Sequence, residues 1–234
     1  MTSAKILWRG AGAVYNGRVA YGELNPQLSA AIQQSLDASQ CEEIFDEGWE
    51  GYEMDFKDLD YQVARANLIV ARTTAAVLKL ASWTLFDNGS LALKTVGKMT
   101  ALEVFDFSNL DFSKVSQIII DPTSLFPCDD TTYIFSMLGY KYGTQVDLNF
   151  TMDCLIPVRS RVIWWFPDAT NMKIFQPMQG TILASGSGVT SSATASVSGH
   201  VFAKSFVHEG TASFLFENIA FDGCAALPAN VDDY

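Results

Sequence analysis

Hydrophobic residues in the second half of the chain occur in short bursts separated by turn-forming residues. Bursts rich in β-branched and aromatic residues occupy 162–166, 172–175, 181–184, 201–203 and 213–216. Similar segments upstream are 90–96, 100–106, 115–120, 133–137 and 146–151. Each is long enough for one strand, and Gly, Ser and Pro between them are typical of successive short β-strands. Because no helical pattern separates them, a sandwich, barrel or solenoid is favoured over a parallel α/β sheet.

Two segments of the first half have helical spacing instead. Apolar residues recur every three or four positions from about Lys57 to about Ala81, with Asp55 as the N-cap. That spacing predicts a helix of roughly 37 Å. The Asn25-Pro26 pair predicts the start of a shorter helix over 26–38. Glycine-rich residues 6–22 are expected to form two short strands.

A run of small residues from Ser185 to Gly199 has no bulky side chain. Periodicity leaves two interpretations open, a flexible loop or a tightly packed strand surface. An array of threonines on one face of a strand requires a spacing of two residues. Thr190 and Thr194 are four residues apart and lack this spacing. The run is therefore a weak candidate for a threonine array.

Composition excludes several classes of protein. Of the 234 residues, 49% are hydrophobic and 18% are charged, which indicates a folded chain. The 15 basic and 26 acidic residues give a formal net charge of −11, which disfavours nucleic acid and anionic lipid as partners. No apolar run is long enough for a membrane span, so none is expected in this segment.

The cysteines and two sequons bear on the cellular compartment. The four cysteines have no C-x-x-C pair; they are Cys41, Cys128, Cys154 and Cys224. Two disulfides in a secreted protein or four free thiols in a cytosolic one are both compatible with this spacing. The sequons at Asn88 and Asn149 favour the secreted alternative. Because the N-terminus lacks a signal-peptide pattern, we expect a mature or shortened form of a longer secreted or cell-surface chain.

Several segments resemble a known family, the choice-of-anchor A domains, which are adhesive domains of microbial surfaces. The matching segments are V-I-W-W-F-P-D-A-T at 162–170, G-T-I-L-A at 180–184, S-G-H-V-F-A-K-S at 198–205, F-D-G-C at 221–224, M-D-F at 54–56 and L-E-V-F-D-F at 102–107. Departures are Trp165 in place of the usual Asn, Ser185 in place of the usual Pro, and glycine-rich repeats reduced to residues 6–22. Microbial ice-binding proteins share this layout and the G-T-I-L-A segment.

The resemblance implies a mainly β fold, a right-handed β-helix (β-solenoid), with one long α-helix packed along its side. The helix would cover seven or eight rungs at a spacing of about 4.8 Å. The short helix over 26–38 belongs to an expected N-terminal region 1–53, which is followed by an expected β-helix region 54–234. We expect the two regions to form one continuous domain 1–234. An open end of such a solenoid predicts possible self-association.

Reactive constellations are scarce in the sequence. His200 and His208, the two histidines, lack the spacing of a zinc helix or a nucleophile elbow. The acidic pair Asp129 and Asp130 could serve a polysaccharide-degrading enzyme or calcium, but solvated loop charge explains it as well. We therefore expect no enzyme, catalytic residue, cofactor or metal.

Exposed aromatic residues are the best ligand-binding candidates. Trp49 and Tyr52 lie in an acidic loop, and Tyr140 and Tyr142 in a turn-like stretch. Such rings can stack on sugars or anchor a protein partner, although packing within the domain is an equally simple explanation. The leading hypothesis is a non-enzymatic extracellular adhesive domain with a protein or polysaccharide ligand. An ice-binding protein is the alternative, and a polysaccharide-active enzyme is third.

Overall fold

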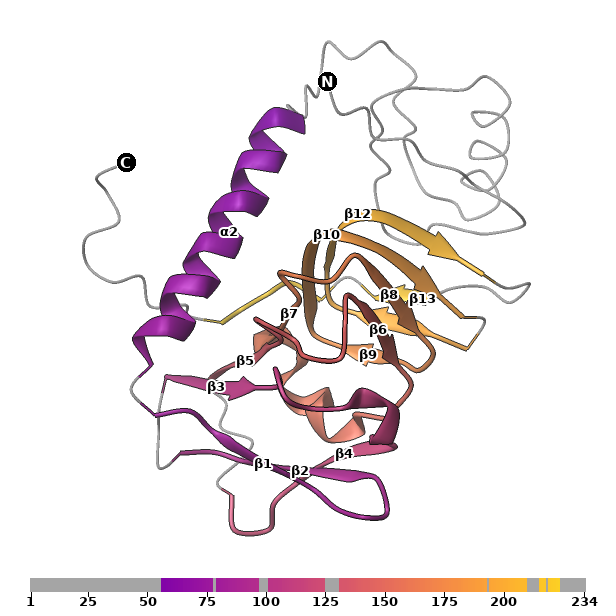
Figure 1. Ribbon diagram of the computed structural model, residues 1–234. Helices are drawn as coiled ribbons and strands as arrows, with labels where there is room; N and C mark the ends of the chain where they lie inside the picture. The colour runs from indigo at the N-terminus through magenta and orange to yellow at the C-terminus, as the bar shows by residue number, and fades with distance from the viewer. Residues whose placement is uncertain are drawn as a thin grey trace. The chain divides into compact units, whose positions relative to one another are not determined.

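A computed structural model describes residues 56–77, 79–96, 101–124, 131–192, 194–209, 215–217 and 219–223 (Figure 1). The chain divides into two compact units, Met1–Val63 and Ala64–Tyr234. Nearly all described residues belong to the second unit, and the account below concerns that unit.

The described elements are mainly strands. The helices are α2 (Phe56–Ala76) and two 3-10 segments, η1 (Phe112–Lys114) and η2 (Asp153–Arg161). The strands are β1 (Ser82–Leu85), β2 (Ser90–Lys94), β3 (Leu102–Asp106), β4 (Gln117–Ile120), β5 (Thr132–Ser136), β6 (Gln145–Leu148), β7 (Val162–Trp165), β8 (Asn171–Ile174), β9 (Met178–Gln179), β10 (Thr181–Ser191), β11 (Ser196–Ser198), β12 (Val201–His208) and β13 (Leu215–Glu217).

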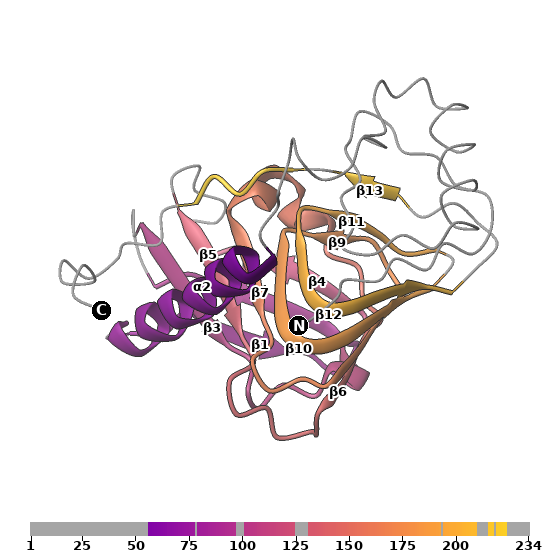
Figure 2. The ribbon, with the colours of Figure 1, turned by 90° about the horizontal axis from the view of Figure 1, so that it is seen from above.

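One large parallel sheet dominates the unit. Its order is β3-β5-β7-β10-β8-β6, and β12 also pairs with β10. The first residues of β10 pair with β7 and its last residues with β8, while β12 follows it on both sides of a register shift between Ala184 and Gly188. Figure 2 shows β10 and β12 bending together. The sheet is thereby curled into a half-barrel, and two three-stranded sheets, β1-β2-β4 and β9-β11-β13, complete the unit.

The predicted right-handed β-helix with a long helix along its side is wrong. Seven parallel strands form one curled half-barrel sheet because the eleven-residue β10 joins both groups of strands. The helix ends at Ala76, five residues before the predicted end at Ala81. Ala81 instead forms a parallel bridge with Phe105, and its N–H donates to the Val104 carbonyl at 2.9 Å, so the chain has already entered the sheet. The predicted helix over 26–38 and strands over 6–22 lie outside the described residues.

Aromatic side chains fill the inner face of the sheet. Register places Phe105, Phe135 and Trp164 side by side on β3, β5 and β7. Their ring centroids are 5.3 Å apart for the first pair and 4.4 Å for the second, and all three side chains are fully buried. Ile182 on β10 continues the same row. Burying rings in register gives both area and favourable ring contacts, so this row is the centre of the core.

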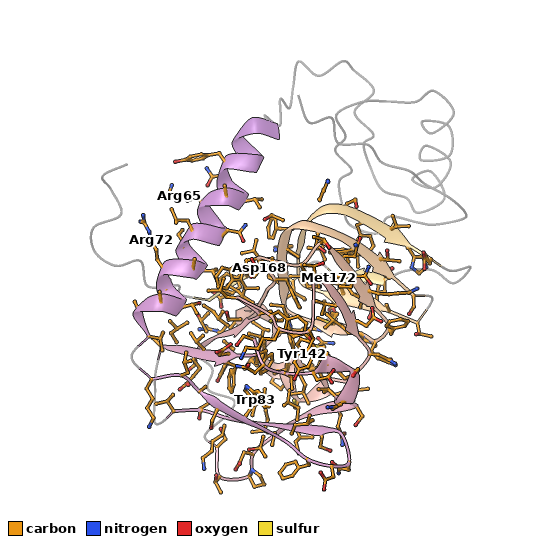
Figure 3. The ribbon with its side chains drawn as sticks, in the orientation of Figure 1. Arg65, Arg72, Trp83, Tyr142, Asp168 and Met172 are labelled. Carbon is orange, nitrogen blue, oxygen red and sulfur yellow. The ribbon has the colours of Figure 1, made fainter. Side chains whose placement is uncertain are left out.

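The outer face of the same strands is largely apolar. Side chains alternate along a strand, so the neighbours of the core residues point outward. Five apolar members of this outward set are at most 7% exposed: Val104, Ile134, Ile163, Trp165 and Leu183. The set also includes the buried Ser136 and Thr181 and the partly exposed Asp106. The part of α2 from Ala64 onward contributes the buried Val70 and Thr73. Arg65 and Arg72 point away from the strands on the other side of the helix (Figure 3).

Asn67 connects α2 to this face through hydrogen bonds. Trp165 donates from Nε1 to Asn67 Oδ1 at 3.0 Å, and Asn67 donates from Nδ2 to Ser185 Oγ at 3.0 Å. Ser185 lies in the register shift of β10. The amide therefore joins the helix to a buried indole on β7 and to the bend of the long strand.

We expect Asn67→Ala to lower the free energy of unfolding by about 1–3 kcal/mol, since it leaves the buried Trp165 N–H without its acceptor. Urea denaturation followed by tryptophan fluorescence measures this difference. Arg65→Ala, on the exposed side of the same helix, is the control and should change stability by no more than about 0.5 kcal/mol. Equal effects of the two substitutions would contradict the anchoring role of Asn67.

Gly180, between β9 and β10, offers a second test of the packing. Its φ is +105°, and a Cβ there would lie 2.7 Å from the Val162 side chain and 2.8 Å from the Val162 carbonyl oxygen. Gly143 has the same φ, but a Cβ there would meet nothing within 4 Å. Gly143→Ala should cost about 1–2 kcal/mol of backbone strain, and Gly180→Ala more than about 3 kcal/mol because steric overlap is added. Thermal unfolding of the two variants, matched in φ, separates strain from overlap; equal costs would show that packing at Gly180 is not tight.

Candidate ligand-binding face

The outer face of the other half of the sheet is polar. On β6, β8 and the second half of β10, buried residues such as Val146, Met172 and Val189 alternate with residues that face outward. We call the outward set on β6, β8, β10 and β12 the polar face: Gln145, Asp147, Asn171, Lys173, Gly188, Thr190, Ser205 and Val207. Each of these residues is exposed or partly exposed.

Strand register arranges the polar face in two rows. The first row is Gln145, Asn171, Gly188 and Ser205, and the second row is Asp147, Lys173, Thr190 and Val207. Neighbours within a row are about 4.8 Å apart, and the rows are about 6.6 Å apart along each strand. Parallel hydrogen bonding fixes these spacings, so the face presents its side chains at regular positions without rearrangement.

The two rows differ in charge. The first row is uncharged, whereas the second contains Asp147 beside Lys173. Lys173 Nζ lies 3.1 Å from Glu209 Oε2 and 5.4 Å from the centre of the Phe175 ring. The one cation of the face is thus flanked by two carboxylates and has no excess positive charge to offer an anion. The polar face is suited to hydrogen bonding more than to charge-driven capture.

Of the predicted aromatic residues, Tyr140 and Tyr142 lie together between β5 and β6. Their ring centroids are 5.6 Å apart. Tyr140 is half-buried and packs on Phe112 at 5.7 Å, and burial raises the pKa of its hydroxyl. Tyr142 is 53% exposed and donates from its hydroxyl to the Asn109 carbonyl at 3.4 Å (Figure 3). Trp49 and Tyr52 lie outside the described residues, so a binding role for the four aromatic residues stays a prediction.

Cys154 carries a free thiol in this structure. It is half-buried, donates to the Ile118 carbonyl at 3.2 Å, and burial raises its pKa to about 11. The thiol is therefore protonated at neutral pH and a poor nucleophile. Cys41, Cys128 and Cys224 lie outside the described residues, and the predicted disulfides are not shown.

Both predicted glycosylation sites are exposed. Asn88, in the β1–β2 turn, accepts from the Ser90 N–H at 3.0 Å through Oδ1. Asn149, just after β6, accepts from Gln176 Nε2 at 3.3 Å. Their modification stays a prediction.

A serine–histidine pair that the sequence analysis did not identify lies at the ends of β10 and β12. Ser191 Oγ and His208 Nδ1 are 2.8 Å apart, but Ser191 is fully buried and cannot reach a substrate in this conformation. Among the described side chains, no group of three or more His, Cys, Asp or Glu residues could hold a metal ion. Asp129 and Asp130 lie outside the described ranges.

The polar face itself was also missed at the sequence level. Polar Asn171 and Lys173 alternate with apolar Met172 and Ile174, a pattern typical of a strand with one polar side. Treating 172–175 as one apolar burst hides this alternation. For β10, small residues on both faces hide any alternation. The shared face becomes visible only from the pairing of β10 with β8.

The outer face of the curled parallel sheet is largely buried in one half and open to solvent in the other. This arrangement defines a β-domain with a preformed surface. A sequence model of a family described as "Putative Ice-binding-like adhesive domain" matches residues 4–214. The chain belongs to this family of ice-binding-like adhesive domains. No curated protein and no solved structure matches the chain significantly.

The family confirms part of what the sequence predicted. An adhesive, ice-binding-like domain is confirmed at this level, while the choice-of-anchor A assignment is not. The family is described as adhesive and not as an enzyme. In the described part of the chain, no helix combines the length and apolar character needed to cross a bilayer.

Proposed function

We propose that this chain is a non-enzymatic adhesive domain that acts outside the cell and binds its ligand through the polar face. The observation that carries this proposal is the contrast between the two outer surfaces of one sheet. The outer residues of β3, β5 and β7 include the buried Val104, Ile134 and Trp165, next to α2, whereas those of β6 and β8 are polar and face solvent. A polar surface is stable in contact with solvent and needs no covering element. Its side chains can therefore contact a ligand directly.

The rigidity of the face supports the same proposal. Each position is fixed by parallel pairing on β6, β8, β10 and β12. The ladder continues past the strand ends, where the N–H groups of Phe175, Ser192 and Glu209 donate to carbonyls on neighbouring strands at 2.8–3.0 Å. A surface that is ordered before binding loses little conformational entropy on association. Such a face can hold an extended ligand with modest individual contacts.

Blocking the middle of the polar face should weaken adhesion strongly. Thr190 lies in the second row, and we expect Thr190→Arg to weaken binding at least about tenfold, since a long cation would displace the ligand from the neighbouring positions. Thr84→Arg, an identical change on the exposed side of β1, is the control and should bind like the wild type. Adsorption isotherms on cellulose, chitin, a β-1,3-glucan and collagen measure the effect. Identical isotherms for both variants and the wild type would rule out the polar face.

Ice binding is the second candidate because the family is ice-binding-like. The second row argues against it: Asp147 and Lys173 bring strongly hydrated charges onto the face, next to the Lys173–Glu209 ion pair. We therefore expect no thermal hysteresis and no inhibition of ice recrystallisation at micromolar protein. Clear hysteresis that Thr190→Arg removes and Thr84→Arg leaves intact would instead assign the same face to ice.

A further inference from the structure

The first row of the polar face contains a notch. Gly188 has no side chain, and its neighbours in the row are Asn171 on β8 and Ser205 on β12. A Cβ at Gly188 would lie 3.2 Å from Ser205 Oγ and 3.7 Å from Asn171 Oδ1. Both side-chain oxygens therefore converge over the glycine from opposite sides. They are at most 6.9 Å apart, which is the sum of those two distances.

The Asn171 amide contacts Thr170, which is hydrogen-bonded in turn to Thr144. Asn171 Nδ2 donates to Thr170 Oγ1 at 3.5 Å, and Thr170 Oγ1 in turn donates to Thr144 Oγ1 at 3.0 Å. This contact directs Nδ2 toward Thr170 through one of its two hydrogens, and Asn171 Oδ1, 3.7 Å from the Cβ position of Gly188, faces the notch as an acceptor. Ser205 Oγ, on the other side, can both donate and accept. The notch thus offers one fixed acceptor and one adaptable hydroxyl.

A hydroxyl group matches this pair. Placed above Gly188, it can donate to Asn171 Oδ1 and accept from Ser205 Oγ, which uses both of its hydrogen-bonding roles. An anionic group would instead face the Asn171 carbonyl oxygen, on a chain with a formal net charge of −11. Because the first row is uncharged from Gln145 to Ser205, an uncharged ligand with many hydroxyl groups is the best match.

We propose that the Gly188 notch is a subsite that seats one hydroxyl group of a neutral polysaccharide. This proposal rests on the proposed function, because it specifies the ligand of the adhesive face. Further sugar units would lie along the first row, over Gln145 and Asn171, where the amides can donate to and accept from neighbouring hydroxyls. Asn171 and Ser205 determine specificity, and Thr170 and Thr144 act as positioning residues through Asn171.

Two glycine-to-alanine variants on the same strand test the subsite. Gly188→Ala fills the notch, whereas a Cβ at Gly186 would have only the Ala169 carbonyl oxygen nearby, at 3.8 Å. Neither glycine has a left-handed φ, so alanine fits the backbone at both positions. We expect Gly188→Ala to weaken binding to cellulose, chitin or a β-1,3-glucan at least about tenfold, and Gly186→Ala to bind like the wild type. Ser205→Ala should weaken it about two- to tenfold, the value of one hydrogen bond.

The outcomes separate this inference from the function on which it rests. If Thr190→Arg weakens binding at least about tenfold while both Gly188→Ala and Ser205→Ala bind like the wild type, the proposed Gly188 subsite is wrong. Binding through the polar face is then still supported. If all variants bind like the wild type, both are wrong. Wild-type binding to alginate, a polyanion, but to no neutral polysaccharide would overturn the ligand class. Circular dichroism and thermal unfolding check each variant; should Gly188→Ala fail to fold, Ser205→Ala alone decides.

Discussion

The shared membership of β10 in both halves of the sheet is the constraint on which the described fold depends. Its first residues lie beside β7 and its last residues beside β8, so one backbone segment fixes where both groups of strands are placed. The register shift between Ala184 and Gly188 allows the strand to bend at this point. On one side of the bend the outer residues are buried near α2, and on the other side they face solvent.

The bend also connects the cover to the open surface. Ser185, inside the shift, accepts from Asn67 of α2, which also accepts from the indole of Trp165. Gly188, at the end of the shift, begins the polar face. Only two residues therefore separate the helix anchor at Ser185 from the notch at Gly188. The connection between the helix anchor and the face therefore runs through the register shift, where β10 advances four positions from Ala184 to Gly188 while β12 advances two.

Local sequence patterns predicted the elements well. The expected strands over 90–96, 100–106, 115–120 and 133–137 contain β2, β3, β4 and β5 at least in large part, and the helix begins near its predicted start. The register in which strands pair was not predictable in the same way, because each burst of apolar residues is short and alike. The resemblance to choice-of-anchor A domains predicts a β-helix instead, and the curled half-barrel differs from that prediction.

The helix shows why local signals end where tertiary pairing begins. Helical spacing continues to Ala81, but that residue gains a sheet bridge to Phe105 and a hydrogen bond to the Val104 carbonyl. Trp83, two residues on, donates from its indole nitrogen to the Asp106 carbonyl at 2.7 Å and packs edge-on against Phe107 at 6.2 Å. These contacts outweigh the small propensity gain of one more helical turn. Long-range partners of this kind leave no trace in the spacing of the segment itself.

The difference in charge between the two rows favours one orientation of a ligand on the polar face. Moving across the strands along the first row, a ligand meets uncharged groups throughout, from Gln145 to Ser205. Moving along any one of β6 or β8, it passes from an uncharged amide to a charged side chain within two residues. An extended neutral chain therefore avoids displacing water from Asp147 and Lys173 only if it runs across the strands, and desolvating such charges is costly. The contrast between the rows thus favours binding across the sheet, with the Gly188 notch between its amide and hydroxyl ends.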